Sequence, residues 1–163
     1  MVSSATRFKS FGTILLFASL NRVVSYDKSL EQQRLELNED KWDLTYAGGC
    51  GYTMKYRRSC FCMPEYLGPF LVVVSADDEV ANAIYLEGSS GELAGTYTAT
   101  EEMNLITISD AFDEIQKALE QNASDLTVIY NQEMGYPSSV SIDWEFMIAD
   151  EETYFTIANV TLL

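Results

Sequence analysis

The 163-residue sequence contains no histidine, and this absence excludes several kinds of active site. A Ser-His-Asp triad, a Cys-His pair, a zinc site with histidine ligands and an imidazole base near neutral pH all need that residue. Catalysis would have to rely on carboxylates, lysine, tyrosine or cysteine, and no pair of carboxylates stands out for hydrolysis. We therefore expect a protein that is not an enzyme and holds no cofactor, with a hydrolase as the least favoured alternative.

Basic residues are also scarce in this chain. It has 10 Lys and Arg against 25 Asp and Glu, which gives a formal net charge of −15. Arg7, Lys9 and Arg22 lie in the first 25 residues, where there is no acid, so the remaining chain carries a charge of −18. Such a surface repels the phosphates of nucleic acids and anionic lipid headgroups, and neither is an expected partner.

Long apolar runs are missing as well. The mostly apolar stretch over residues 11–20 is shorter than the about 20 residues that a membrane-spanning helix needs. Basic residues precede it, and Val23 and Ser25 are small residues at the positions that signal peptidase prefers. These features predict a secretory signal peptide over residues 1–25, a secreted product, and no membrane span after cleavage. An uncleaved anchor and a transit peptide are the alternatives.

The first predicted helix covers residues 30–44. Ser29 is placed to be its N-cap, Gln32 would complete a capping box, and a Gly-Gly pair at residues 48–49 would end it. We expect this helix to cover part of a sheet. Its apolar residues form two lines, Leu30, Leu37 and Leu44 on one face and Leu35 and Trp42 on another.

The second predicted helix covers residues 107–121, with Thr107 as its N-cap and Asp110 in its first turn. The acidic residues of this segment lie off its apolar stripe and are interpreted as a solvated face. The stripe consists of Ile108, Phe112, Ile115 and Leu119.

Six segments have the composition of β-strands: residues 52–62, 70–76, 79–86, 126–130, 139–146 and 154–161. Residues 63–69 and 87–102 are expected to be irregular because of their proline, glycine and polar content. The links between consecutive strands are too short for parallel crossovers. The sequence thus predicts one α+β domain over residues 26–163, a monomer with a single, largely antiparallel sheet and both helices on one face. In the third strand the inward candidates are Val80, Ile84 and Leu86.

The segment of residues 52–62 carries the most distinctive side chains. Its alternation gives two sides, with Tyr52, Met54 and Tyr56 on one and Thr53, Lys55 and Arg57 on the other. If the period continues, Cys60 and Cys62 lie on the tyrosine side. They follow Arg57 and Arg58, which are the only adjacent basic pair in the chain.

Cys60 and Cys62 are candidates for disulfide or redox chemistry. Residues two apart in a strand are about 6.6 Å apart, whereas a disulfide needs Cβ atoms about 4 Å apart, so a bond between them requires a kink. Such a strained bond is easily reduced, and Arg57 or Arg58 nearby would favour a thiolate. A structural disulfide is favoured over buried free thiols and over a redox or soft-metal site. Since the chain has 3 cysteines, Cys50 included, one thiol stays free or pairs between chains.

Four aromatic residues are candidates for a binding surface: Tyr52, Tyr56, Tyr136 and Trp144. If they lie on the sheet face that the helices leave open, they would form a surface for a protein or a small ligand. If they lie under the helices, they belong to the core.

Two weaker patterns complete the candidate sites. Asp143, Asp150 and Glu152 could bind calcium, but they lack the spacing of a calcium-binding loop, and solvated acidic residues at the end of a hairpin are favoured. Asn122 and Asn159 match the glycosylation acceptor pattern, which chance alone would produce about once here.

A scattered set of residues resembles a known family. The matching residues are Trp42, the Tyr52–Cys62 segment, Gly68-Pro69, Gly135-Tyr136-Pro137, Ser141-Ile142-Asp143, and residues 148–152 before Tyr154. Together they are similar to a bacterial family of unknown function, whose members are small secreted or lipoprotein-like proteins. The resemblance implies an exported α+β domain and supplies no activity or catalytic residue. Cys50 is outside the pattern.

The sequence therefore favours a secreted, non-enzymatic domain that binds a protein or a small ligand. The alternative is a thiol-redox or soft-metal protein that uses Cys60 and Cys62.

Titration of free thiols in the secreted protein separates these hypotheses. With 3 cysteines, we expect one reactive thiol before reduction and three afterwards, with a bond that resists mild reductant. A pair that is reduced readily would support the redox alternative instead, and a carboxylate-dependent hydrolytic activity would contradict both.

Overall fold

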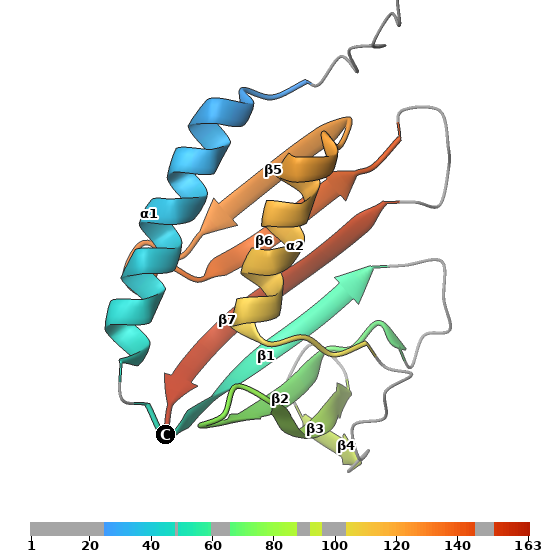
Figure 1. Ribbon diagram of the computed structural model, residues 1–163. Helices are drawn as coiled ribbons and strands as arrows, with labels where there is room; N and C mark the ends of the chain where they lie inside the picture. Colours follow the sequence, from blue (N-terminus) through green and yellow to red (C-terminus); the bar gives the residue numbers. More distant parts are fainter. Residues whose placement is uncertain (1–24, 48, 60–65, 88–91, 96–103, 146–151) are drawn as a thin grey trace, which may run out of the picture.

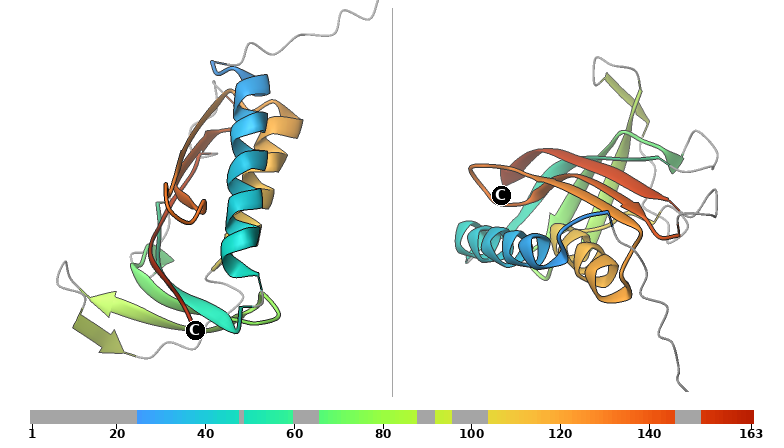
Figure 2. Two further views of the ribbon diagram at one scale, coloured as in Figure 1. Left: turned by 90° about the vertical axis from the view of Figure 1, so that its left-hand side faces the viewer. Right: turned by 90° about the horizontal axis from the view of Figure 1, so that it is seen from above.

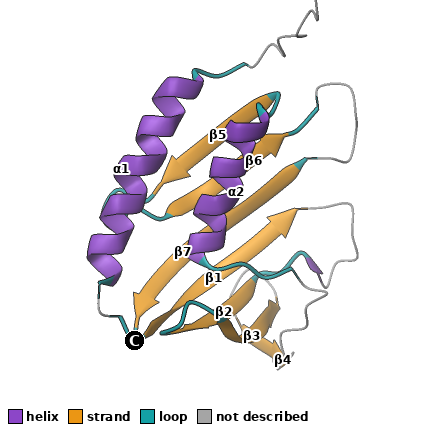
Figure 3. Ribbon diagram, in the orientation of Figure 1, coloured by secondary structure: helices purple, strands orange, loops and turns teal. Residues whose placement is uncertain are grey.

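The structure is a computed structural model that describes residues 25–47, 49–59, 66–87, 92–95, 104–145 and 152–163. Within these residues, two helices lie on one face of a seven-stranded antiparallel sheet (Figures 1 and 3). This confirms the predicted α+β class and the placement of both helices. The elements are α1 (Lys28–Tyr46), β1 (Gly51–Ser59), β2 (Phe70–Ser75), β3 (Val80–Glu87), β4 (Glu92–Gly95), α2 (Ile108–Gln121), β5 (Asp125–Tyr130), β6 (Pro137–Asp143) and β7 (Thr153–Leu162).

The sheet joins two halves of the chain through its last strand. The strand order is β4-β3-β2-β1-β7-β6-β5, so β7 lies between β1 and β6 and pairs antiparallel with both. Figure 2 shows both helices on the same side of the sheet, and it shows the β2–β3–β4 end turning away from the rest. We call the side without helices the open face.

One strand was not predicted. β4 lies inside residues 87–102, which the sequence analysis expected to be irregular, and it extends a sheet that was predicted to have about six strands. Its short Glu-Leu-Ala-Gly sequence has no alternation long enough to be recognised, and it forms a strand by pairing with β3.

The first helix begins earlier than expected. Its N-cap is Asp27 rather than Ser29, because a carboxylate oxygen of Asp27 accepts hydrogen bonds from the backbone N–H groups of Ser29 (3.0 Å) and Leu30 (3.1 Å). Gln32 therefore does not form the predicted capping box; its side-chain amide instead donates to Glu36 and to Gln116 of α2. Either residue type can cap, and the backbone decides which one is placed to do so.

The second helix agrees with its prediction. Thr107 is the N-cap, and the capping box with Asp110 is complete in both directions. Asn122 ends the helix in the left-handed conformation, and Ile108, Phe112, Ile115 and Leu119 are buried as the stripe predicted.

A bulge in β3 makes the prediction that Ile84 faces the core wrong. Val73 pairs with Asn82 while Val74 pairs with Val80, so β3 has one extra residue at Ala81. The extra residue reverses the alternation, and Ala83 rather than Ile84 becomes buried on the helix side. Ile84 pairs with Leu71 on the open face, where it is half-buried.

The core lies between the sheet and the two helices, and β1 is at its centre. Tyr52, Met54 and Tyr56 are buried while Lys55 and Arg57 are not, which confirms the predicted alternation. Two aromatic rings of α1 pack against Tyr52: Trp42 at 5.3 Å and Tyr46 at 5.5 Å between ring centroids, both edge to face.

The hydroxyl of Tyr52 connects three elements. It accepts a hydrogen bond from the backbone N–H of Ile108 in the first turn of α2 (2.8 Å) and donates one to the Asp78 carboxylate in the β2–β3 turn (3.4 Å). The other oxygen of this carboxylate accepts from the Thr107 hydroxyl (3.2 Å). These contacts fix the start of α2 against β1 and the β2–β3 turn.

We predict that Tyr52→Phe lowers the free energy of unfolding by about 1–3 kcal/mol, because it leaves a buried N–H without its acceptor. Urea denaturation measures the change. Tyr154→Phe is the matched control: Tyr154 is 42% exposed, and its replacement should alter the stability by less than about 0.5 kcal/mol. Equal effects of the two substitutions would contradict this role of Tyr52.

Candidate binding site

The cysteine candidates are only partly described. Cys60 and Cys62 lie outside the described residues, so their pairing stays a prediction, while Cys50 is a free and exposed thiol. Arg57 and Arg58 lie on opposite faces of β1, with Arg57 exposed on the open face and Arg58 half-buried on the helix side. The two guanidinium groups therefore lie in different environments, on opposite sides of the sheet.

Three of the four aromatic candidates belong to the core. Tyr52, Tyr56 and Tyr136 are at most 5% exposed and lie on the helix-covered side. They are therefore core residues and do not form a binding surface on the open face. Burial raises the pKa of Tyr56 to about 12, and it also raises the pKa values of Tyr52 and Tyr136. These phenols stay neutral at physiological pH and cannot act as bases.

Trp144 lies outside the strand that was predicted to contain it. β6 ends at Asp143, and the half-buried Trp144 donates from its indole N–H to the Thr153 hydroxyl (3.1 Å) while the Lys117 ammonium lies 5.2 Å from its ring centroid. Trp144, Tyr56 and Arg58 line a pocket of about 680 Å³ beside α2. This α2 pocket has mixed charge, because Asp110, Asp113 and Glu114 also line it.

The calcium candidates do not form a described site. Asp143 is half-buried at the end of β6, Glu152 is exposed before β7, and Asp150 lies outside the described residues. Among the residues that the structure describes, no group of three His, Cys, Asp or Glu side chains could hold a metal ion. The proposed acceptors Asn122 and Asn159 are both exposed, and both have positive φ.

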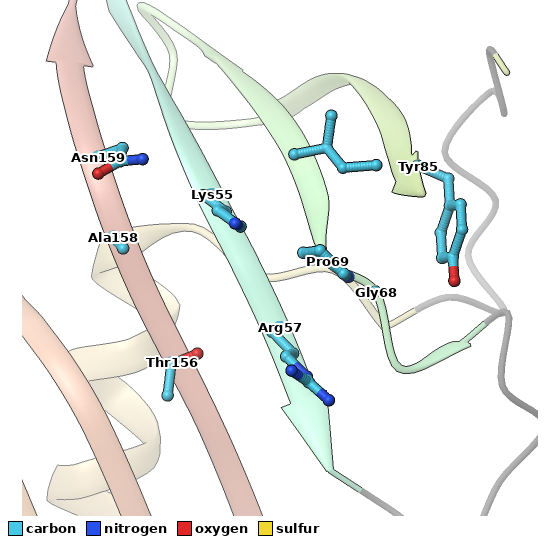
Figure 4. Close-up of a pocket in the computed structure, with 9 residues that line it drawn as sticks. Lys55, Arg57, Gly68, Pro69, Tyr85, Thr156, Ala158 and Asn159 are labelled. Atoms are coloured by element: carbon cyan, nitrogen blue, oxygen red, sulfur yellow. The ribbon is translucent and has the colours of Figure 1, made fainter. Parts of the chain in front are cut away.

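The open face carries a second pocket, of about 710 Å³ (Figure 4). It lies over the junction of β1 and β7 and reaches across to the start of β2 and to β3. The lining residues are Lys55, Arg57, Gly68, Pro69, Tyr85, Leu86, Thr156, Ala158 and Asn159. We call it the open-face pocket.

Sheet register brings two cations into this pocket. Lys55 and Arg57 are two apart in β1, so their side chains leave the same face with Cα atoms about 7 Å apart. Leu71 and Ala158 pair with Lys55, and Thr156 pairs with Arg57. None of the described residues that line the pocket is acidic, and neither cation is in an ion pair with a described residue.

Two backbone features shape the rim of the pocket. Thr53 pairs with Thr161 but Lys55 pairs with Ala158, so β7 has a bulge in which Asn159 takes a φ of 53°. This bulge places both Ala158 and Asn159 on the pocket wall. On the other side Gly68 has a φ of 78°, and a Cβ there would lie 3.0 Å from the carbonyl oxygen of Tyr56.

Sequence reasoning did not group the charged and polar residues of this pocket: it named Arg57 as a neighbour of the cysteines, Lys55 only as a residue on the same side of the strand, and Asn159 as a glycosylation acceptor. The alternation of β1 does place Lys55 beside Arg57, which is a signal that could have been used. Thr156 and Asn159 join them only because β7 pairs with β1 and carries a bulge, and neither fact is visible in the sequence.

The site and the fold define an α+β protein with one helix-covered sheet face and one open face that carries a basic pocket. The chain belongs to a family of unknown function (DUF6174), whose sequence profile matches residues 34–162. A search of curated proteins and a search of solved structures each gave no match. No helix in the described part of the chain is long and apolar enough to cross a membrane.

Two groups of the residues that carried the sequence resemblance come together in the described part of the chain, while Cys60, Cys62 and residues 148–151 lie outside it. Trp42, Tyr52 and Tyr136 pack together, with the Trp42 and Tyr136 ring centroids 6.3 Å apart. Gly135 (φ 88°) lets the β5–β6 turn approach α1, where a Cβ would lie 2.5 Å from the carbonyl oxygen of Asn38. The second group, Arg57, Gly68 and Pro69, lines the open-face pocket.

We predict that the two cations of the open-face pocket contribute nothing to folding. Lys55→Gln and Arg57→Gln should each leave the free energy of unfolding within about 0.5 kcal/mol of the unaltered protein, since no described residue pairs with either charge. Thermal denaturation followed by circular dichroism measures this. A loss well above 1 kcal/mol would show that these side chains are structural.

Proposed function

We propose that this protein is a secreted, non-enzymatic binding domain whose open-face pocket binds a small organic anion. The observation that carries the proposal is the pair Lys55 and Arg57. Neither cation is in an ion pair with a described residue, and no described residue that lines their pocket is acidic. In a chain with a net charge of −15, such a local concentration of positive charge needs a reason other than solubility.

Electrostatics favours an anionic ligand at this position. Two like charges on side chains whose Cα atoms are about 7 Å apart repel each other, and a bound carboxylate, sulfonate or phosphate would relieve that repulsion. Hydrogen bonds from an ammonium or guanidinium to an anion are stronger than neutral ones. The hydroxyl of Thr156 and the amide of Asn159 add polar groups on the adjacent strand.

The remaining wall favours a ligand with an apolar part. Pro69, Tyr85, Leu86 and Ala158 supply carbon surface opposite and beside the cations. The volume of about 710 Å³ is within the range of about 300–1,000 Å³ of small-molecule sites. An aromatic or aliphatic acid combines both properties.

Secretion is supported by the sequence alone. The positive start, the short apolar run and the small residues at positions 23 and 25 are those of a signal peptide. Residues 1–24 lie outside the described part of the chain. Intact-mass analysis of exported protein tests the predicted cleavage after Ser25.

Fluorescence titration with 8-anilinonaphthalene-1-sulfonate tests the pocket, because this probe combines a sulfonate with an apolar ring system. We expect saturable binding that weakens as sodium chloride screens the cations. Lys55→Gln/Arg57→Gln should weaken it by about tenfold or more, since each charged contact contributes about 1 kcal/mol or more.

The matched control is Lys28→Gln/Lys41→Gln, which removes the same charge from α1 on the helix-covered side. This variant should bind the probe as the unaltered protein does. Equal weakening in both double variants would mean that the probe responds only to net charge and would overturn the proposal. Circular dichroism in the aromatic region confirms that each variant is folded before the titration.

A further inference from the structure

The outer side of α1 carries a line of exposed leucines. Leu30, Leu37 and Leu44 are 54%, 69% and 80% exposed, whereas Leu35 and Trp42 on the same helix are at most 2% exposed. Residues seven apart in a helix return to nearly the same direction, so the three leucines form one straight row, which we call the leucine stripe. The sequence analysis recognised the two apolar lines of this helix, and the structure shows that only one of them faces the core.

This stripe is a feature that α1 does not need for its own packing. The helix contacts the sheet through Leu35 and Trp42, and its outer leucines are not among the residues that pack against the core. Isolated exposed leucines are common on protein surfaces, but a row at seven-residue spacing supplies one of the two apolar positions per heptad through which helices pair.

Acidic residues flank the leucine stripe on one side. Glu36 and Asp43 each immediately precede a stripe leucine, and Asp40 lies one turn beyond Leu37. We call these three residues the acidic flank. None of them is in an ion pair with a described residue, and the last turn of α1 contains no basic residue. The negative end of the helix dipole adds to this uncompensated charge.

The neighbouring Glu39 is subject to the negative charge of the same acidic residues. Burial raises the pKa of its carboxyl, and the charges of Asp43, Asp113, Asp40 and Glu36 raise it further. Acidic residues of α1 and α2 thus crowd one side of the stripe.

The cations on the opposite side of the stripe are directed toward the sheet. Arg34 bonds to Glu31 and to the backbone carbonyl of Val128, and its guanidinium lies 5.6 Å from the ring centroid of Tyr130. The Lys41 ammonium donates to the carbonyl of Gln132. Neither side chain is placed to neutralise the acidic flank.

We propose that the leucine stripe and the acidic flank together form a docking surface for a basic amphipathic helix of a partner protein. The apolar side of that helix would cover Leu30, Leu37 and Leu44, and its lysines or arginines would pair with Glu36, Asp40 and Asp43. A second copy of this chain fits less well. Antiparallel pairing of two α1 helices, with Leu30 opposite Leu44, would place Glu36 of one copy near Glu36 of the other, between two bodies that each carry −15.

This docking surface is independent of the open-face pocket. The stripe leucines are exposed on α1, which lies on the covered side of the sheet (Figure 2), whereas the pocket lies on the open face (Figure 4). Substitutions at one site therefore leave the other unchanged, and the two proposals can fail separately.

Fluorescence anisotropy with the full-length protein tests the docking surface. The probe is a labelled peptide of about 18 residues, with leucines at helical spacing and lysines elsewhere, which is long enough to form an amphipathic helix. The comparison peptide has glutamate in place of each lysine. We expect binding of the lysine peptide only, and a loss of about tenfold or more in affinity for Leu30→Gln/Leu37→Gln/Leu44→Gln.

Two further variants separate the contributions. Glu36→Gln/Asp40→Asn/Asp43→Asn should weaken binding and reduce its dependence on salt. Ile129→Gln is the matched control, because Ile129 is an apolar residue that is 57% exposed on the other face of the sheet, and it should bind the peptide normally.

Three results would overturn the proposal. One is equal binding of the lysine and glutamate peptides, and another is unchanged affinity of the triple leucine variant while its circular dichroism spectrum remains that of the unaltered protein. The third is a dimer in analytical ultracentrifugation that the leucine substitutions convert to a monomer, which would assign the stripe to a second copy of this chain.

Discussion

The buried hydroxyl of Tyr52 is the contact on which the arrangement of the helices depends. It lies in the central strand β1, accepts from the first turn of α2 and donates to the β2–β3 turn, while its ring packs against Trp42 and Tyr46 of α1. One side chain therefore positions both helices on the same face. Burial raises the pKa of its phenol, so the donor and acceptor pattern persists over the physiological pH range.

Placing both helices on one face gives the two sides of the sheet different properties. The covered side is filled with apolar and aromatic side chains, and at its edge the Thr107 hydroxyl donates a hydrogen bond to the Asp78 carboxylate. The open side keeps Lys55 and Arg57 in a pocket without a described acid, while many acidic residues lie on the outer surfaces of α1 and α2. Although the net charge is −15, the open-face pocket is therefore positive while the outer surfaces of the helices are negative.

Local patterns predicted those elements in which neighbours along the chain decide the structure. The alternation from Tyr52 to Arg57 and the N-cap at Thr107 are of this kind, and both are present. The prediction was wrong for Ile84, because a bulge in β3 depends on pairing with β2. The prediction of Ser29 as the N-cap of α1 was also wrong, because the backbone places the Asp27 side chain to accept hydrogen bonds from the N–H groups of the first turn.

The sequence by itself determined the α+β class, the antiparallel sheet, the residues of the central strand and the two apolar lines of α1, since these follow from periodicity and link length. Tertiary structure alone decided that Tyr52, Tyr56 and Tyr136 are core residues, and it decided which line of leucines is exposed. It also brought Thr156 and Asn159 beside Lys55 and Arg57. The physical reason is that strand order and register join segments about a hundred residues apart, and hydrophobic periodicity identifies a face without saying what will cover it.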